Sequence, residues 1–245
     1  MKVQIYALTS VSDAVATAEA GADLIGVVVD NDRVVVEDRS IAEARAIFAA
    51  VESRALTVAL TLGTDAQRIV RMLEATRAQI LHLSGMDLSL PTITRIRDRL
   101  RDTRLMIAVP VTGPEALELA RERAPLADYL ILDSRAPQEA VIGATGQTHD
   151  WNISARIVAE SPVPVILAGG LSPDNVAEAI ARVRPWGVDS LTRTDFPGRR
   201  GHKDPERVRA FVRNARAAAA QLEGPTGTGG SATMRAAGMA PPSPR

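Results

Sequence analysis

Short apolar runs rich in β-branched residues alternate along the chain with longer segments whose apolar residues recur at helical spacing. The apolar runs are continuous, which is typical of strands covered on both faces in a parallel sheet. Eight strands are predicted, at residues 2–8, 23–29, 55–62, 79–84, 104–111, 128–133, 163–168 and 187–192. Eight helices are predicted after them, at residues 11–20, 41–52, 65–76, 91–101, 114–123, 152–160, 173–183 and 205–222.

Several helix starts are marked by residues that cap helices. Ser40 is a good N-cap, and Thr64 followed three positions later by Gln67 fits a capping box. Two other predicted helices begin with a capping residue followed by proline, at Ser172-Pro173 and Asp204-Pro205. Proline suits the first helical turn because its missing N–H would have no partner there.

Eight strands, each followed by a helix, predict an α/β fold of the (β/α)8 TIM-barrel type over residues 1–223, with a doubly wound sheet as the alternative. In a barrel, the loops after the strands carry function. Residues 224–245 are rich in Gly, Pro, Ser and Thr and show no periodicity, so they are predicted to be a disordered tail.

Composition narrows the function classes. The chain has no cysteine, which excludes disulfides, cysteine metal sites and cysteine nucleophiles. Its 29 basic and 29 acidic residues give a formal net charge of +0, and aromatics are 3%, so no nucleic-acid partner is expected. No apolar run reaches the length of a membrane span, and the start MKVQIYAL lacks the pattern of a signal peptide, so a cytoplasmic location is expected.

Two ionisable side chains end predicted strands. Asp133 closes the run YLILD, where a partly buried carboxyl could act as general acid or base, or could serve as a helix cap. His82 lies inside LHL and could bind substrate or transfer a proton, or could be a satisfied barrel histidine. The three histidines show no metal-ligand spacing, so no metal and no cofactor is expected.

Glycines and arginines suggest an anion site. Gly169-Gly170 follows the seventh strand and suits a phosphate held on backbone amides, or a tight turn. Arg193 follows the eighth strand, where it could bind an anion or block the site, and Arg33 could hold a carboxylate or be a solvated charge. The glycine-containing segment 141–151 could let backbone amides approach a ligand.

Several segments, in order, resemble the phosphoribosylanthranilate isomerase family over nearly all of residues 2–215. They are GADLIGVVV at 21–29, LILDS at 130–134, GATG at 143–146, DW at 150–151, PVILAGGLSPDNVAEAI at 164–180, GVDS at 187–190, PG at 197–198 and KDPERVRAFV at 203–212.

The resemblance implies a cofactor-independent Amadori rearrangement in tryptophan biosynthesis. In the family reaction an aldose aminated by anthranilate becomes the 1-amino-ketose: an acid opens the furanose ring and a base removes the proton at C2. The resemblance makes Asp133 the acid. It also implies a small phosphorylated or carboxylated substrate and a monomer or homodimer. The contacts implied by the resemblance are Arg33 near the anthranilate carboxylate, His82 at the substrate pocket, and Gly169 and Gly170 at the phosphate. Gly143 and Gly146 are further candidates for the substrate, and Thr192 and Arg193 for the phosphate.

The chain departs from the family at the base. The family opens with a Lys-Ile-Cys-Gly type segment whose cysteine is the base, whereas this chain reads Gln4-Ile5-Tyr6-Ala7. Tyr6 therefore stands at the catalytic base position, although a phenol has an ordinary pKa of about 10 against about 8.5 for a thiol. The family's Ser-Ser-Gly type segment after the eighth strand is replaced by Leu191-Thr192-Arg193.

Three functions follow from this pattern. The first is the family's isomerisation, with Asp133 as acid and Tyr6 or a water as base. The second is a divergent paralogue that acts on another small anionic substrate, with Arg33 and Arg193 binding the anion. The third is a non-catalytic barrel kept for ligand binding.

Overall fold

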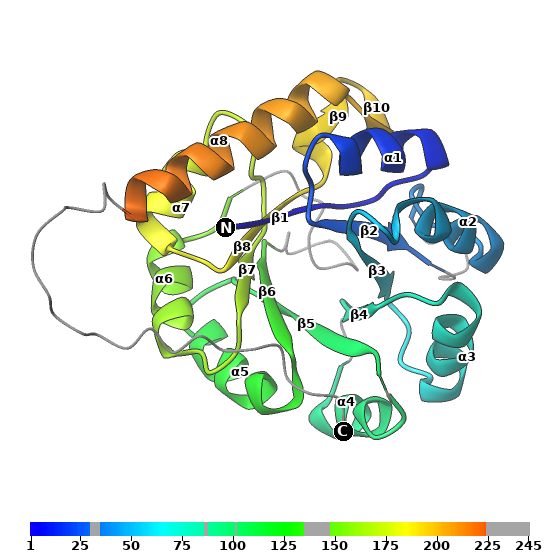
Figure 1. Cartoon of the computed structure of the whole chain (residues 1–245). Coiled ribbons are helices and arrows are strands. Elements are labelled where there is room, and N and C mark those ends of the chain that lie inside the picture. The colour runs from blue at the N-terminus through cyan, green and yellow to red at the C-terminus, as the bar shows by residue number, and fades with distance from the viewer. Residues whose placement is uncertain (30–34, 86–87, 101, 135–147, 224–245) are drawn as a thin grey trace, which may run out of the picture.

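A computed structural model describes residues 1–29, 35–85, 88–100, 102–134 and 148–223. Within them, eight parallel strands pair in chain order, and the last pairs with the first, which closes a barrel (Figure 1). The prediction of a (β/α)8 barrel is therefore confirmed, and a doubly wound sheet is excluded. The strands are β1 (Lys2–Ile5), β2 (Leu24–Val28), β3 (Leu56–Thr61), β4 (Ile80–Leu83), β5 (Arg104–Pro110), β6 (Tyr129–Asp133), β7 (Val165–Leu167) and β8 (Gly187–Ser190).

Helices surround the barrel, as Figure 1 shows, and each predicted helix lies where the periodicity placed it to within a few residues. They are α1 (Val11–Glu19), α2 (Ile41–Val51), α3 (Ala66–Thr76), α4 (Leu90–Arg97), α5 (Ala116–Arg123), α6 (Trp151–Glu160), α7 (Val176–Val183) and α8 (Pro205–Glu223), with short 3-10 turns η1 (Ala124–Leu126) and η2 (Thr192–Thr194). Among the described parts of the chain, no helix has the length and apolar content needed to cross a membrane. The predicted tail at 224–245 lies outside the described residues.

Two predicted helix starts are confirmed. The Ser40 hydroxyl accepts from the Glu43 amide (3.3 Å) and the Glu43 carboxylate accepts from the Ser40 amide (2.8 Å), a complete capping box. Asp204 accepts from the amide of Glu206 (2.9 Å) at the start of α8.

Two other predicted starts are wrong. Asp65, not Thr64, caps α3, because its carboxylate accepts from the amides of Gln67 (2.8 Å) and Arg68 (3.0 Å). A carboxylate is the stronger acceptor at a helix N-terminus. Helix α7 begins at Val176 rather than at the predicted 173, since the turn before it is closed by the side chain of Asn175.

The apolar residues form two separate clusters. The larger one lies between the strands and the helices and includes Ile25, Leu81 and Phe211. The smaller one fills the barrel interior and includes Tyr6, Met106 and Ile131. Because alternate strand residues point inward, the side chains at the carboxyl ends of the strands line the mouth of this interior.

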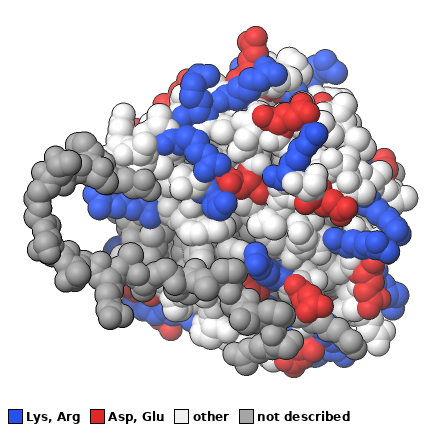
Figure 2. Space-filling view, in the orientation of Figure 1, with Lys and Arg blue, Asp and Glu red and all other residues white. Residues whose placement is uncertain are grey.

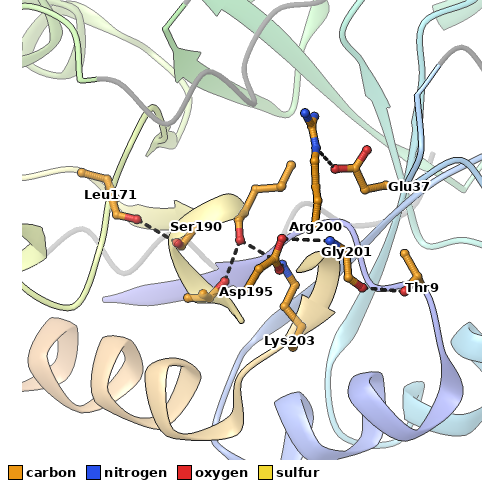
Figure 3. Close-up of polar contacts among 10 residues, drawn as sticks. Thr9, Glu37, Leu171, Ser190, Asp195, Arg200, Gly201 and Lys203 are labelled. Carbon is orange, nitrogen blue, oxygen red and sulfur yellow. Dashed lines mark hydrogen bonds and ion pairs between the residues drawn. The ribbon is translucent and has the colours of Figure 1, made fainter. Parts of the chain in front are cut away.

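A hairpin that the sequence patterning did not predict follows the barrel. Strands β9 (Asp195–Phe196) and β10 (Arg199–Lys203) pair antiparallel (Figure 1). The Lys203 ammonium and the Asp195 carboxylate, 2% and 3% exposed, form an ion pair at 2.6 Å. The ammonium also donates to the Leu191 carbonyl (2.9 Å), and the amide of Gly201 donates to Asp195 (2.9 Å) (Figure 3). This buried pair fixes the hairpin to the loop after β8.

We predict that Lys203→Met lowers the free energy of unfolding by about 3–5 kcal/mol, because it leaves the Asp195 carboxylate buried without its cation. Urea unfolding followed by circular dichroism measures the loss. The matched control is Arg54→Met, which breaks the pair with Glu19 in which both side chains are about half exposed. It should change the free energy by less than about 1 kcal/mol. Equal losses in the two variants would contradict the prediction.

Candidate functional site

One pocket opens at the carboxyl ends of the strands, the end at which barrels of this type carry function. It encloses about 730 Å³ including its open mouth. Seven of the predicted site residues line it: Tyr6, His82, Asp133, Gly169, Gly170, Thr192 and Arg193. Arg33, Gly143 and Gly146 lie outside the described residues, so their predicted roles stay predictions.

Asp133 is the last residue of β6, and its carboxyl group faces the pocket. Its Oδ1 accepts a hydrogen bond from the amide of Ser134 (2.7 Å). Burial raises the pKa of Asp133 to about 7, and the hydrogen bonds from Ser134 oppose the rise. A carboxyl with such a pKa is protonated in part of the molecules at neutral pH, which a general acid requires.

Tyr6 and His82 form a buried hydrogen-bonded pair. The phenol oxygen lies 2.9 Å from His82 Nδ1, and the two rings meet edge to face at 5.5 Å. Burial lowers the pKa of His82 to about 3, so the imidazole is neutral. We assign the phenol as the donor, which leaves the imidazole proton on Nε2. His82 Nε2 is buried and makes no hydrogen bond within the described part of the chain.

The structure does not support Tyr6 as the base. Burial, and next the charge of Asp189, raise the pKa of the phenol well above its ordinary value of 10.0. A depressed pKa would be needed for a phenolate at neutral pH, and the surroundings act in the opposite direction. Tyr6 instead orients the imidazole of His82.

The position of Tyr6 depends on its neighbours in the sheet. Its amide donates to the Ser190 carbonyl (3.0 Å), and the chain then turns through Ala7, whose φ of 60° is left-handed. The ring lies over Gly26 of β2, where an added Cβ atom would fall 2.6 Å from ring atom Cε1. The absence of a side chain at Gly26 therefore makes room for the tyrosine ring.

The loops after β7 and β8 form one wall of the pocket. Gly169 and Gly170 have φ values of 82° and 64°, which glycine adopts without strain. A Cβ on Gly169 would fall 3.0 Å from the amide nitrogen of Ser134, so the loop after β7 packs tightly against the end of β6. The Asn175 side chain donates to the Gly170 carbonyl (3.1 Å), which fixes the loop. The Ser190 hydroxyl donates to the Leu171 carbonyl (2.7 Å) and joins the two loops (Figure 3).

Arg193 of η2 lines the pocket on the same wall as the two glycines. The structure thus brings together the glycine pair, Thr192 and Arg193, all of which were predicted for the phosphate. Backbone amides beside a guanidinium are a suitable environment for an anion. Elsewhere on the surface, basic and acidic side chains intermingle on the face shown in Figure 2.

Three charged side chains of the pocket were not predicted: Glu37, Asp189 and Arg200. Glu37, 2% exposed, forms an ion pair with Arg200 of β10, and the carbonyl of the adjacent Gly201 accepts from Thr9 (2.5 Å) (Figure 3). Asp189 lies within β8 rather than after it. A search confined to the loops missed it, although an acidic residue inside a buried strand is itself a signal. Across the described residues, no group of three or more His, Asp or Glu side chains could hold a metal ion.

We predict that Gly26→Ala destabilises the protein by about 1–3 kcal/mol, because the new methyl group overlaps the buried ring of Tyr6. In a Tyr6→Ala background the same substitution should cost much less, since the ring is gone. Urea unfolding of the two single variants and the double variant gives the coupling free energy between the sites. A coupling near zero would show that the ring does not require the glycine.

The comparisons with known proteins agree with this geometry. The family model described as N-(5'phosphoribosyl)anthranilate (PRA) isomerase matches residues 3–214. The N-(5'-phosphoribosyl)anthranilate isomerase of Haloferax volcanii is 36% identical over 221 residues, which cover 89% of this chain and 94% of that protein.

Solved structures give the same result for the fold. The phosphoribosyl anthranilate isomerase of Thermotoga maritima superposes with a TM-score of 0.77 at 24% identity, covering 89% of this chain and 99% of that chain. A phosphoribosyl anthranilate isomerase in complex with reduced 1-(o-carboxyphenylamino)-1-deoxyribulose 5-phosphate superposes with a TM-score of 0.74 at 23% identity, with coverages of 89% and 99%. The sequence matches and the shared barrel lead to one conclusion: the chain belongs to the N-(5'-phosphoribosyl)anthranilate isomerase family.

Proposed function

We propose that this chain isomerises N-(5'-phosphoribosyl)anthranilate to the 1-amino-ketose, with Asp133 as the general acid. The family acts in tryptophan biosynthesis, and its members are isomerases. One observation carries the assignment to this site: a buried carboxyl that can hold a proton near neutral pH opens into the same pocket as a left-handed glycine pair and an arginine.

The substrate ends are assigned by charge. The 5-phosphate lies against the backbone of Gly169 and Gly170, with Thr192 and Arg193 beside it. The solved relative in complex with reduced 1-(o-carboxyphenylamino)-1-deoxyribulose 5-phosphate supports a phosphorylated ligand in a barrel of this shape. The neutral imidazole of His82 directs its Nε2 proton to an acceptor oxygen of the substrate, and Arg33, Gly143 and Gly146 complete the anthranilate side of the proposal.

The chemistry of the first step follows from Asp133. Its proton passes to the furanose ring oxygen while the C1–O bond breaks, and the nitrogen lone pair forms the C1=N bond. A protonated carboxyl at this position serves better than a charged one, because a carboxylate has no proton to donate.

The location and the oligomeric state of the protein remain proposals. We expect the enzyme to act in the cytoplasm and to be a monomer or a homodimer. Analytical ultracentrifugation of the purified chain tests the oligomeric state.

We predict that Asp133→Asn lowers kcat/KM for N-(5'-phosphoribosyl)anthranilate by about 100-fold or more, because the amide cannot donate the required proton. The loss of substrate fluorescence in a purified assay measures the rate. Asp98→Asn, an exposed carboxylate at the end of α4, is the matched control and should leave the rate unchanged. Wild-type protein without turnover would refute the proposed function. Activity retained in Asp133→Asn would refute the role of Asp133 alone.

A further inference from the structure

A second buried carboxyl group, that of Asp189, lines the same pocket as Asp133. Asp189 is the third residue of β8, is 6% exposed and pairs in register with Gln4 of β1. The Gln4 side chain donates to its Oδ1 at 3.1 Å. Among the described residues this neutral amide makes the one hydrogen bond to the carboxyl group, so no cation is bonded to it directly.

The charged and titratable groups around Asp189 come from several elements. Lys203 of β10 faces it, but the ammonium is bonded to Asp195 and to the Leu191 carbonyl. Burial raises the pKa of Asp189 to about 8; the charge of Asp133 adds to the rise, and Gln4 and Lys203 oppose it. Tyr6 faces it as a neutral phenol.

Among the described residues, the other ionisable groups that line the pocket are Glu37, Arg200, Arg193 and neutral His82. Asp189 therefore shares the low-dielectric interior chiefly with Asp133.

We propose that the carboxylate of Asp189 is the general base that removes the proton from C2 of the substrate. The proposal rests on the isomerase function proposed above and deepens it. Its basis is geometric: the carboxyl groups of Asp133, the last residue of β6, and of Asp189, within β8, reach one pocket from either side of β7, so one can protonate the ring oxygen while the other accepts the proton from C2.

The other pocket groups are poorer bases. The Tyr6 phenol retains its proton, and His82 uses Nδ1 in the hydrogen bond with Tyr6. The carboxylate of Glu37 is already engaged in an ion pair with Arg200. Within the part of the chain that the structure describes, no cation is bonded to Asp189. Two carboxyls with different surroundings in one pocket are the arrangement that divides acid and base roles.

The step balances as follows. After Asp133 has opened the ring, the substrate carries a C1=N bond with a positive charge on nitrogen. The Asp189 carboxylate takes the C2 proton; the C2–H electron pair forms a C1=C2 bond, and the C=N π pair moves to nitrogen, which becomes neutral. The resulting enol-amine gains a proton at C1 and loses one from the C2 hydroxyl. The product is an isomer of the substrate. A proton passes from Asp189 to Asp133 through solvent to reset the pair.

The pair must hold one proton to be active. Because the two carboxyls interact, they titrate as a unit, and the singly protonated form is most populated between pH values of about 7 and 8. The higher pKa of Asp189 places more of that single proton on Asp189, so the reactive arrangement, with Asp133 protonated and Asp189 ionised, is the less populated of the two. We therefore predict a bell-shaped dependence of kcat/KM on pH. The rate rises as the pair loses its first proton and falls as it loses the second.

The test compares the wild type with Asp189→Asn, Asp133→Asn and Tyr6→Phe. Asp189→Asn should lower kcat by about 100-fold or more and remove the low-pH limb of the bell, because no carboxylate then has to form. Tyr6→Phe keeps the ring and removes the phenol hydroxyl, so it should lower the rate by less than about tenfold. Asp98→Asn again serves as the unchanged control.

Substrate deuterated at C2 separates the two roles. When the base is missing, C–H cleavage limits the rate, so Asp189→Asn should increase the deuterium isotope effect on kcat. When the acid is missing, ring opening limits the rate, so Asp133→Asn should bring the isotope effect toward one. Affinity for reduced 1-(o-carboxyphenylamino)-1-deoxyribulose 5-phosphate, measured by calorimetry, should stay within about threefold of wild type in Asp189→Asn, which shows an intact pocket.

Several results would overturn the proposal. Asp189→Asn with kcat within tenfold of wild type would refute the base role while leaving the isomerase function in place. A slow Asp189→Asn whose isotope effect is unchanged, or which no longer binds the reduced analogue, would assign Asp189 a structural role. A loss in Tyr6→Phe as large as in Asp133→Asn would return the base role to Tyr6. Wild-type protein without turnover would refute the proposed function, and this inference with it.

Discussion

Alternate side chains of eight parallel strands share one closed interior, and polar groups placed there find few partners. This confinement controls the chemistry of the pocket. Asp133 and Asp189 are carboxyls that would be ionised on the surface at neutral pH, and burial moves their pKa values to about 7 and about 8. The same burial keeps His82 neutral and Tyr6 protonated. Burial alone therefore gives carboxyl groups that can be protonated at neutral pH and an uncharged imidazole that can donate a hydrogen bond.

The tyrosine at the end of β1 illustrates how packing and chemistry are linked. Its ring fits because Gly26 has no side chain. Its hydroxyl is hydrogen-bonded to Nδ1 of His82 and so fixes the orientation of that imidazole. Tyr6 is larger than the cysteine of the family segment it resembles, and in this structure its phenol is protonated and bonded to His82. Gln4, at the position of the lysine in the family segment, donates a hydrogen bond to Asp189 from its neutral amide. These two departures are two residues apart in the sequence: Tyr6 lines the pocket, and Gln4 of β1 is bonded to Asp189, which lines it too.

Much of the fold could be predicted from the sequence, because continuous apolar runs and helical periodicity report burial directly. The seven predicted residues of the pocket could be found because they follow strand ends or match family segments. Asp189 belongs to the segment GVDS, which matches the family, but it lies inside a strand rather than at its end, and its importance comes from neighbours on β1, β6 and β10. The hairpin was missed because β10 reads RRGHK, with no apolar alternation, and its stability comes from the ion pair of Asp195 with Lys203. The starts of α3 and α7 were misplaced because a nearby side chain, Asp65 or Asn175, competes successfully for the free backbone groups.

The hairpin also bears on how the protein is made. It joins residues near the end of the barrel to loops near its beginning, through the bond between Gly201 and Thr9 and the ion pair between Arg200 and Glu37. During synthesis the N-terminal part of a chain emerges first. The contacts of Thr9 and Glu37 with the hairpin therefore cannot form until about residue 203 has left the ribosome. Until then the carboxylate of Glu37 stays in water. Completion of the pocket is thus one of the last events in folding, and a nascent chain cannot bind substrate before it is nearly finished.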